Sequence, residues 1–123
     1  MRVLIVDDVQ LFRSTLKKLL VDFCNVAEED VYEADNVNVA LEKYGEVSPQ
    51  LVFLDIVMPG IGGVEAVSLF LKNYADAKII MCSSSIETDN VTNCLVAGAL
   101  DYVLKPITSA ERLKEAIVVA MSS

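Results

Sequence analysis

Histidine is absent from the sequence, and cysteine is scarce. Without histidine, the chain can have neither histidine-based acid–base catalysis nor histidine metal ligands. The three cysteines, Cys24, Cys82 and Cys94, are odd in number and form no Cys-x-x-Cys pair. We therefore interpret them as small buried hydrophobic residues of a reducing compartment, and not as disulfides or metal ligands.

Basic residues are also few, with 10 Lys and Arg against 18 Asp and Glu and a formal net charge of −8. A surface that binds nucleic acid has to be basic, so we expect no nucleic acid partner for this chain. The acidity fits an acidic metal site or a basic protein partner. It fits a merely well-solvated surface equally well.

Long hydrophobic runs are missing as well, although 54 % of the residues are hydrophobic. The wholly apolar runs are far shorter than the roughly 20 residues that cross a bilayer, and the N-terminal residues lack the cleavage-site pattern of a signal peptide. We therefore expect a cytoplasmic protein without membrane insertion. The length suits one domain, residues 1–123, with a single core.

Short apolar runs are what the sequence does contain. In the central one, residues 51–54 run without a polar break into Asp55, and a Met-Pro-Gly turn follows. Such a run, bounded by a turn, predicts a strand that is buried on both faces of a parallel sheet. Four similar runs predict further strands over residues 2–6, 31–34, 77–82 and 101–104.

Between the predicted strands, apolar residues recur at helical spacing and predict five helices. Asp35 or Asn36 is expected to cap the second helix, Gly98 to end the fourth, and Thr108 with Glu111 to form a capping box for the last. The expected core faces are Phe12, Leu16, Leu19, Leu20 and Phe23; Val37, Ala40, Leu41 and Tyr44; Val64, Val67, Leu71 and Tyr74; Val91, Cys94 and Leu95; and Leu113, Ala116, Ile117 and Ala120.

Strict alternation of strands and helices predicts an α/β fold, a doubly wound parallel sheet with five strands and helices on both faces. Polar side chains follow four of these strands: Asp7 and Asp8, then Asp55, Ser83 and Lys105. Each of them alone is more often a turn, cap or solvated residue. Together they are informative, because the carboxyl ends of parallel strands meet at one edge, where α/β proteins bind ligands.

Three neighbouring carboxylates repel one another, and a divalent cation would relieve that repulsion. All-oxygen ligands favour a hard ion, so we expect Mg²⁺, with Mn²⁺ as a substitute. One carboxylate could then attack phosphorus and form an acyl phosphate. Lys105 would neutralise charge on the transferred group, and the Ser83 hydroxyl could donate a hydrogen bond to one of its oxygens.

A set of short motifs is spread along the chain: Val6-Asp7-Asp8, Leu54 to Pro59, Ser83, Gly98-Ala99 with Tyr102, and Lys105-Pro106. In this order and spacing, the chain resembles the receiver domain of a response regulator of two-component signalling, of the stand-alone CheY-like type. The resemblance implies a flavodoxin-like (βα)5 fold with strand order 2-1-3-4-5.

The resemblance also implies roles for the acidic residues. Asp55 would be the phosphoacceptor, taking its phosphoryl group from a histidine kinase. Asp8, Asp55 and the backbone carbonyl of Val57 would bind Mg²⁺, and Asp7 would act largely through water. Such a domain catalyses only its own phosphorylation and dephosphorylation, so it would not count as an enzyme.

For the other matching residues the resemblance implies a switch. Ser83 would take the hydroxyl position and Lys105 the lysine position of the family, with a cis Lys105–Pro106 bond. Tyr102 would be the aromatic residue that turns inward when Ser83 moves to the phosphoryl group. The last two helices and the fifth strand would then bind a downstream protein target.

Two departures from the family pattern are visible. Gly62-Gly63 stands where many relatives have Asp-Gly, and glycine as a helix N-cap costs only a few tenths of a kcal/mol against aspartate. Val57 and Ser85 each lie two residues past a site residue, where relatives can carry polar side chains that help water attack the acyl phosphate. From Val57 we predict slow autodephosphorylation.

Several alternatives remain. A haloacid-dehalogenase-type phosphatase would need a second Asp where this chain has Val57, and a flavodoxin-like binder of FMN would place its phosphate beside Asp7 and Asp8, which would repel it. The chain could also be a phosphorylation-independent scaffold, or a receiver domain cut from a larger regulator with an output domain.

The apolar residues 117–121 could be a partner or dimer surface, so we expect a monomer or weak dimer. Chemotaxis or motility is the commonest role for a stand-alone receiver.

Overall fold

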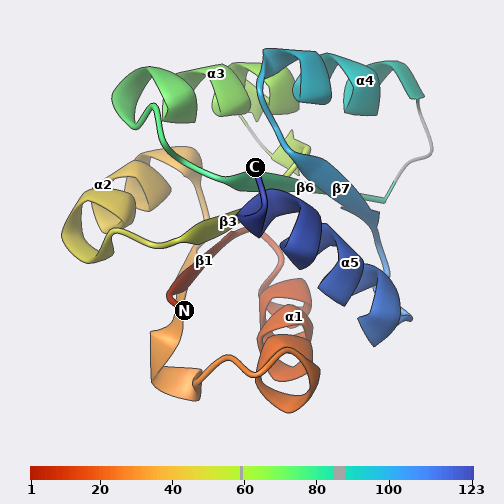
Figure 1. Cartoon of the computed structure of the whole chain (residues 1–123). Coiled ribbons are helices and arrows are strands. Elements are labelled where there is room, and N and C mark those ends of the chain that lie inside the picture. Colours follow the sequence, from red (N-terminus) through yellow and green to blue (C-terminus); the bar gives the residue numbers. More distant parts are fainter. Residues whose placement is uncertain (59, 85–87) are drawn as a thin grey trace.

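The computed structural model describes residues 1–58, 60–84 and 88–123. Its centre is a parallel sheet of five strands in the order β2-β1-β3-β6-β7 (Figure 1). Counting only these five strands along the chain, the order is 2-1-3-4-5, so the predicted fold class and topology are confirmed. The strands are β1 (Val3–Val6), β2 (Val31–Ala34), β3 (Leu51–Asp55), β6 (Ile79–Ser83) and β7 (Asp101–Leu104).

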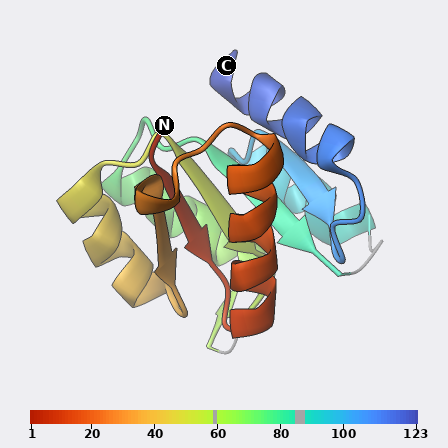
Figure 2. The ribbon, with the colours of Figure 1, turned by 90° about the horizontal axis from the view of Figure 1, so that it is seen from below.

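Helices cover both faces of this sheet. They are α1 (Gln10–Phe23), α2 (Val37–Val47), α3 (Gly63–Asn73), α4 (Thr88–Ala97) and α5 (Ala110–Met121), and a short 3-10 helix, η1 (Glu28–Asp30), precedes β2. α1 and α5 pack on one face, whereas α2, α3 and α4 pack on the other (Figures 1 and 2).

The strands supply alternate side chains to the two resulting cores. In β3, for example, Val52 and Leu54 belong to the core under α2, α3 and α4, and Leu51 and Phe53 belong to the core under α1 and α5. All four are fully buried. This two-sided burial explains why the strands read as unbroken apolar runs. No helix among the described residues is long and apolar enough to cross a membrane.

The register of the sheet brings the carboxyl ends of the strands level with one another. Val6 pairs with Leu54, and Asp55 pairs with Cys82. The next pair on this edge joins Ser83 to Leu104. The residues that immediately follow β1 and β7 therefore lie at the same edge as the ends of β3 and β6.

Two of the predicted helix starts are decided by the structure. Asn36, and not Asp35, caps α2, because its side chain accepts a hydrogen bond of 2.9 Å from the amide of Val39. The predicted capping box at Thr108 and Glu111 is wrong. Ser109 caps α5 instead, and its hydroxyl accepts from the amide of Arg112 at 3.3 Å. A serine directly after a threonine offers an equivalent cap one residue later, which the sequence pattern alone cannot rank.

The prediction of the core faces is wrong for three residues, because Phe23, Val64 and Leu95 are exposed. In α3 the buried stripe consists of Gly63, Ala66, Val67 and Phe70. Small residues near the start of a helix can approach the sheet closely, and the stripe is then displaced from the one that large side chains alone suggest. Of the cysteines, Cys82 and Cys94 are buried as expected and Cys24 only partly, and all three are free.

The chain between β3 and α3 contains a small antiparallel hairpin that the sequence did not predict. β4 (Val57–Met58) pairs with β5 (Ile61–Gly62), and Gly60 between them has a φ of 87°. Gly62 then acts as the N-cap of α3, as expected. A Cβ at Gly63 would lie only 3.1 Å from the backbone of Ile56, so a larger residue here would require that backbone to shift by a few tenths of an ångström. Pro59, within the predicted turn, lies outside the described residues.

Candidate functional site

Three carboxylates converge where β1 and β3 end. Asp7 and Asp8 follow β1, Asp55 is the last residue of β3, and one oxygen from each lies within 4.8 Å of the others. Asp7 is fully buried and Asp55 is 5 % exposed, whereas Asp8 is open to solvent. The fold therefore brings together the three acids that the sequence placed at this edge.

Lys105, which follows β7, extends its ammonium group into the cluster. Its Nζ lies 2.5 Å from Oδ2 of Asp7 and 3.3 Å from Oδ1 of Asp55. The ring of Phe12, on α1, lies on another side of this group, with 4.3 Å between Nζ and the ring centroid. A cation over an aromatic face is attracted by the ring quadrupole, so Phe12 helps to hold the lysine. The Lys105–Pro106 peptide bond is cis, as expected.

Main-chain hydrogen bonds fix the carboxylates themselves. Oδ1 of Asp7 accepts from the amide of Val9 at 2.8 Å, and Oδ1 of Asp55 accepts from the amide of Val57 at 3.2 Å. Arg13, on α1, donates from Nη1 to the main-chain oxygen of Asp7 at 2.6 Å. Its Nε also pairs with Glu33 at 3.1 Å. The acidic turn after β1 is therefore tied to both α1 and β2.

The electrostatic balance of the cluster follows from burial and charge. Burial raises the pKa of Asp55 above its ordinary value, the charge of Asp7 raises it further, and Lys105 opposes both effects. For Lys105 itself, burial lowers the pKa, but the hydrogen bond and charge of Asp7 together with the charge of Asp55 outweigh this, so the pKa is raised overall. Lys105 therefore stays a cation, and the ionised form of Asp55 is held at some cost in free energy.

Ser83 and Tyr102 lie on the two strands next to the cluster. Ser83, the last residue of β6, is buried, and its main-chain oxygen accepts from the amide of Lys105 at 2.7 Å. Tyr102, on the outer strand β7, is partly buried against the core under α2, α3 and α4. The side chain of Val57 is 66 % exposed beside the cluster. Ser85, which also departs from the family pattern, lies outside the described residues.

The donor set fits a hard divalent cation. Its three carboxylates offer oxygen ligands only, close together, and one of the acids is exposed so that an ion could enter from solvent. Mg²⁺ typically takes one or two carboxylates and keeps several waters, which this arrangement allows. Lys105 supplies the compensating positive charge when no ion is bound.

This fold and this site define a receiver domain. A family model, the response regulator receiver domain, matches residues 3–118, and the chain belongs to this family. It therefore acts in phosphorylation-activated response regulator signalling, as the resemblance implied. Receiver domains generally bind Mg²⁺ at an acidic pocket, and the cluster at the ends of β1 and β3 is the acidic group of this chain that corresponds to it.

The chain is similar to particular proteins over almost its full length. It is 42 % identical to the chemotaxis protein CheY of Bacillus subtilis over 116 residues, which cover 94 % of this chain and 93 % of that protein. It is 38 % identical to CheY of Thermotoga maritima, with the same coverage of both chains. Among solved structures, the receiver domain of NtrX from Brucella abortus superposes with a TM-score of 0.87 at 25 % identity, covering 98 % of both chains.

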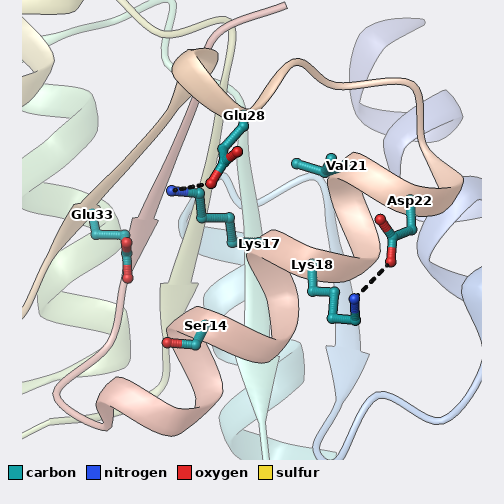
Figure 3. A pocket seen from close by; sticks show the side chains of 7 residues that line it. All are labelled: Ser14, Lys17, Lys18, Val21, Asp22, Glu28 and Glu33. Carbon is teal, nitrogen blue, oxygen red and sulfur yellow. Dashed lines mark ion pairs between the residues drawn. The ribbon is translucent and has the colours of Figure 1, made fainter.

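A separate pocket of about 380 Å³ lies along α1, facing η1 and β2 (Figure 3). Its charged side chains are largely paired with one another: Lys17 lies 3.9 Å from Glu28, and Lys18 lies 3.2 Å from Asp22. None of the four site residues Asp7, Asp8, Asp55 and Lys105 lines it. This pocket is therefore not part of the acidic site.

Two contacts of the site were missed by sequence reasoning. Phe12 was assigned only to the core face of α1, although its ring also contacts the ammonium group of Lys105. Arg13 carries no role in the sequence pattern, yet it donates to the main chain of Asp7. The available signal was their position in the first turn of α1, which follows the acidic pair directly and therefore lies near the carboxyl edge of the sheet.

Proposed function

We propose that Asp55 is the phosphoacceptor of this chain and that a histidine kinase is the phosphodonor. The single observation that supports this best is the position of Asp55, whose carboxylate is buried at the end of the central strand and faces the ammonium group of Lys105 at 3.3 Å. Asp7 is already paired with Lys105 at 2.5 Å, and Asp8 is exposed. Asp55 is therefore the acid best placed to attack phosphorus with a cation at hand.

Asp8, Asp55 and the main-chain carbonyl of Val57 would hold Mg²⁺, with Asp7 acting largely through water and Mn²⁺ as a substitute. The ion would supply charge neutralisation for the phosphoryl group as it approaches the carboxylate. Lys105 would contact the transferred group from the opposite side. The raised pKa of Lys105 supports this role, because the residue remains a cation over the physiological pH range.

Ser83 and Tyr102 would convert the chemical step into a change of surface. The Ser83 hydroxyl would move to a phosphoryl oxygen, and the Tyr102 ring would turn inward into the space that this movement frees. The responding surface is formed by α4, β7 and α5, on which Leu104 and Val118 are 44 % and 64 % exposed. Exposed apolar side chains of this kind suit a protein partner.

The pathway that we propose is chemotaxis, because full-length relatives with 38–42 % identity carry the name of a chemotaxis protein. The domain would catalyse only its own phosphorylation and dephosphorylation, and would turn over no other substrate. That residues 1–123 form one domain, and that the protein is a cytoplasmic monomer or weak dimer, stay predictions.

The test is phosphorylation by a small donor, followed by intact-mass measurement. The protein is incubated with acetyl phosphate and Mg²⁺, beside Asp55→Asn, a sample with the metal chelated, and Asp22→Asn as a matched loss of one carboxylate away from the site. We expect a single phosphoryl adduct in the wild type and in Asp22→Asn only. Absence of the adduct from the wild type, under conditions that label a known receiver domain, would contradict the proposal and favour a phosphorylation-independent scaffold.

A further inference from the structure

Arg112, in the first turn of α5, makes an unusual number of contacts with two consecutive residues of β7. Its Nη1 lies 3.2 Å from Oδ2 of Asp101, and its Nη2 lies 3.0 Å from Oδ1 of the same carboxylate. Nη2 also donates to the main-chain oxygen of Tyr102 at 2.6 Å. A guanidinium group that binds a carboxylate with both of its nitrogens is held in one orientation.

Asp101 completes the arrangement from the other side of the tyrosine. Its Oδ1 accepts from the amide of Tyr102 at 2.8 Å. The amide and the carbonyl of Tyr102 are therefore both bound, one by Asp101 directly and the other by Arg112. Because β7 is an outer strand of the sheet, these groups would otherwise be open to water or to another chain.

The same guanidinium group also contacts the tyrosine side chain. Cζ of Arg112 lies 5.6 Å from the centroid of the Tyr102 ring, within the range of a cation–π interaction. On this side, packing does not enclose the ring, because a pocket of about 250 Å³ between β7 and α5 is lined by both residues. On the side of the pocket, the guanidinium group of Arg112 is thus a main contact that favours the observed position of the Tyr102 ring.

We propose that Arg112, oriented by Asp101, is a positioning residue of the switch and stabilises Tyr102 in its resting position. This inference rests on the proposed function, in which Tyr102 changes position on phosphorylation. The backbone bonds fix the place from which the side chain leaves β7. The cation–π contact with Arg112 favours the observed ring position, in addition to the packing of Tyr102 against the core under α2, α3 and α4. Loss of Arg112 therefore shifts the equilibrium of the ring toward the position that it takes when Asp55 is phosphorylated.

The expected size of the shift follows from that single contact. A cation–π interaction at a partly exposed site corresponds to a change of about two- to fivefold in an equilibrium constant. By linkage, a ligand that prefers the ring position of the phosphorylated protein binds a variant without Arg112 more tightly than wild type, by the same factor. Beryllofluoride, which mimics the phosphoryl group, is the probe with which this can be measured.

The experiment observes Tyr102 by ¹⁹F NMR in protein labelled with fluorotyrosine, with Tyr102→Phe to assign its signal. In Arg112→Gln, without any ligand, we expect the Tyr102 signal to move part of the way toward its position in the wild-type beryllofluoride complex. With Mg²⁺ present, the midpoint of a beryllofluoride titration should fall about two- to fivefold. Lys114→Gln is the matched control, since it removes one exposed cation from the same helix and should change neither quantity.

Asp101→Asn provides the second arm. It leaves the cation in place but removes the carboxylate that orients it, so it should act in the same direction as Arg112→Gln. The double variant should go little further than either single one, because both act through the same contact. A purely structural role would lower the melting temperature without moving the Tyr102 signal or the midpoint.

The outcomes separate this inference from the proposed function. If the wild-type Tyr102 signal does not respond to beryllofluoride and Mg²⁺, the proposed function is wrong and the inference with it. If the wild type responds, and Arg112→Gln folds with an unchanged signal and midpoint, the inference alone is overturned. Should Arg112→Gln fail to fold, Asp101→Asn carries the test, and a folded Asp101→Asn with a wild-type signal and midpoint overturns the inference equally.

Discussion

Neutralising Asp55 is expected to stabilise the protein when no metal ion is bound. The Asp55 carboxylate is 5 % exposed, and its pKa is raised by burial and by the charge of Asp7. Its ionised form is therefore less favourable in the folded chain than in the unfolded chain. Asp55→Asn removes this charge with almost no change in shape and leaves the pair between Lys105 and Asp7 intact.

The magnitude can be worked out from the distances. With an effective dielectric constant of about 20, attraction between Lys105 and Asp55 at 3.3 Å amounts to about 5 kcal/mol. Repulsion from Asp7, whose ligand oxygen lies within 4.8 Å of that of Asp55, amounts to about 3.5 kcal/mol or more. Asp8 adds a smaller, solvent-screened repulsion. The charge terms nearly cancel, so the cost of burying the carboxylate remains, and we expect a gain of about 1–3 kcal/mol.

The assay is urea unfolding with the metal chelated, followed by circular dichroism over a pH series. An acid with a raised pKa in the folded state costs nothing below its unfolded pKa, near 3.9. Stability then falls as the pH rises from that value to the folded pKa, and is constant above it. The advantage of Asp55→Asn should therefore be absent at low pH and complete at neutral pH. Asp22→Asn, at a site that is 43 % exposed, should stay within about 0.5 kcal/mol of wild type.

Added Mg²⁺ should reverse the order of stability. An ion that binds only the folded chain stabilises it by about 2.7 kcal/mol at one hundred times its dissociation constant, and Asp55→Asn has lost one ligand. A variant that is less stable than wild type at pH 7 without metal would refute this reasoning. It would mean that the ion pair with Lys105 outweighs both burial and repulsion.

Three further predictions follow from single residues. Val57→Asn should speed autodephosphorylation roughly tenfold, because an exposed amide beside Asp55 can orient water and valine cannot. An unchanged lifetime of the acyl phosphate in this variant would contradict this, as would a wild-type lifetime as short as that of a fast chemotaxis regulator measured beside it. Burial raises the pKa of all three thiols, but Cys24 alone is partly accessible, so it should react with a thiol reagent before Cys82 and Cys94, with all three reacting in denaturant as the control. Gly98→Ala should cost about 1–3 kcal/mol in urea unfolding, because its φ is 126° and a Cβ would meet Leu71 at 2.3 Å; an unaltered midpoint would show that the turn relaxes freely.

The fold was largely predictable because its signals are local. An apolar run such as residues 51–54, followed by a carboxylate and a turn, identifies a buried strand and its carboxyl end without knowledge of any partner. Once the strands alternate with helices, the topology brings Asp7, Asp55, Ser83 and Lys105 to one edge. The geometry confirms that convergence.

Other features depend on contacts that local patterns do not encode. The choice of Ser109 over Thr108 as a cap depends on where the first turn of α5 sits against β7. The exposure of Phe23 and Leu95, each in the last turn of its helix, depends on tertiary packing. The approach of Phe12 to Lys105 joins residues that are far apart in sequence and is set by packing, as are the contacts of Arg112 with β7.

The ion pair between Lys105 and Asp7 joins residues 98 positions apart in the chain. During synthesis at about 5–20 residues per second, the acidic turn after β1 exists for several seconds before Lys105 has been made. A nascent chain that ends before β7 thus has the acids but lacks their counter-charge. Asp55 in such a chain still lacks Lys105 as its cationic partner. Phosphoryl transfer to Asp55 should therefore become possible only after β7 and Lys105 have left the ribosome.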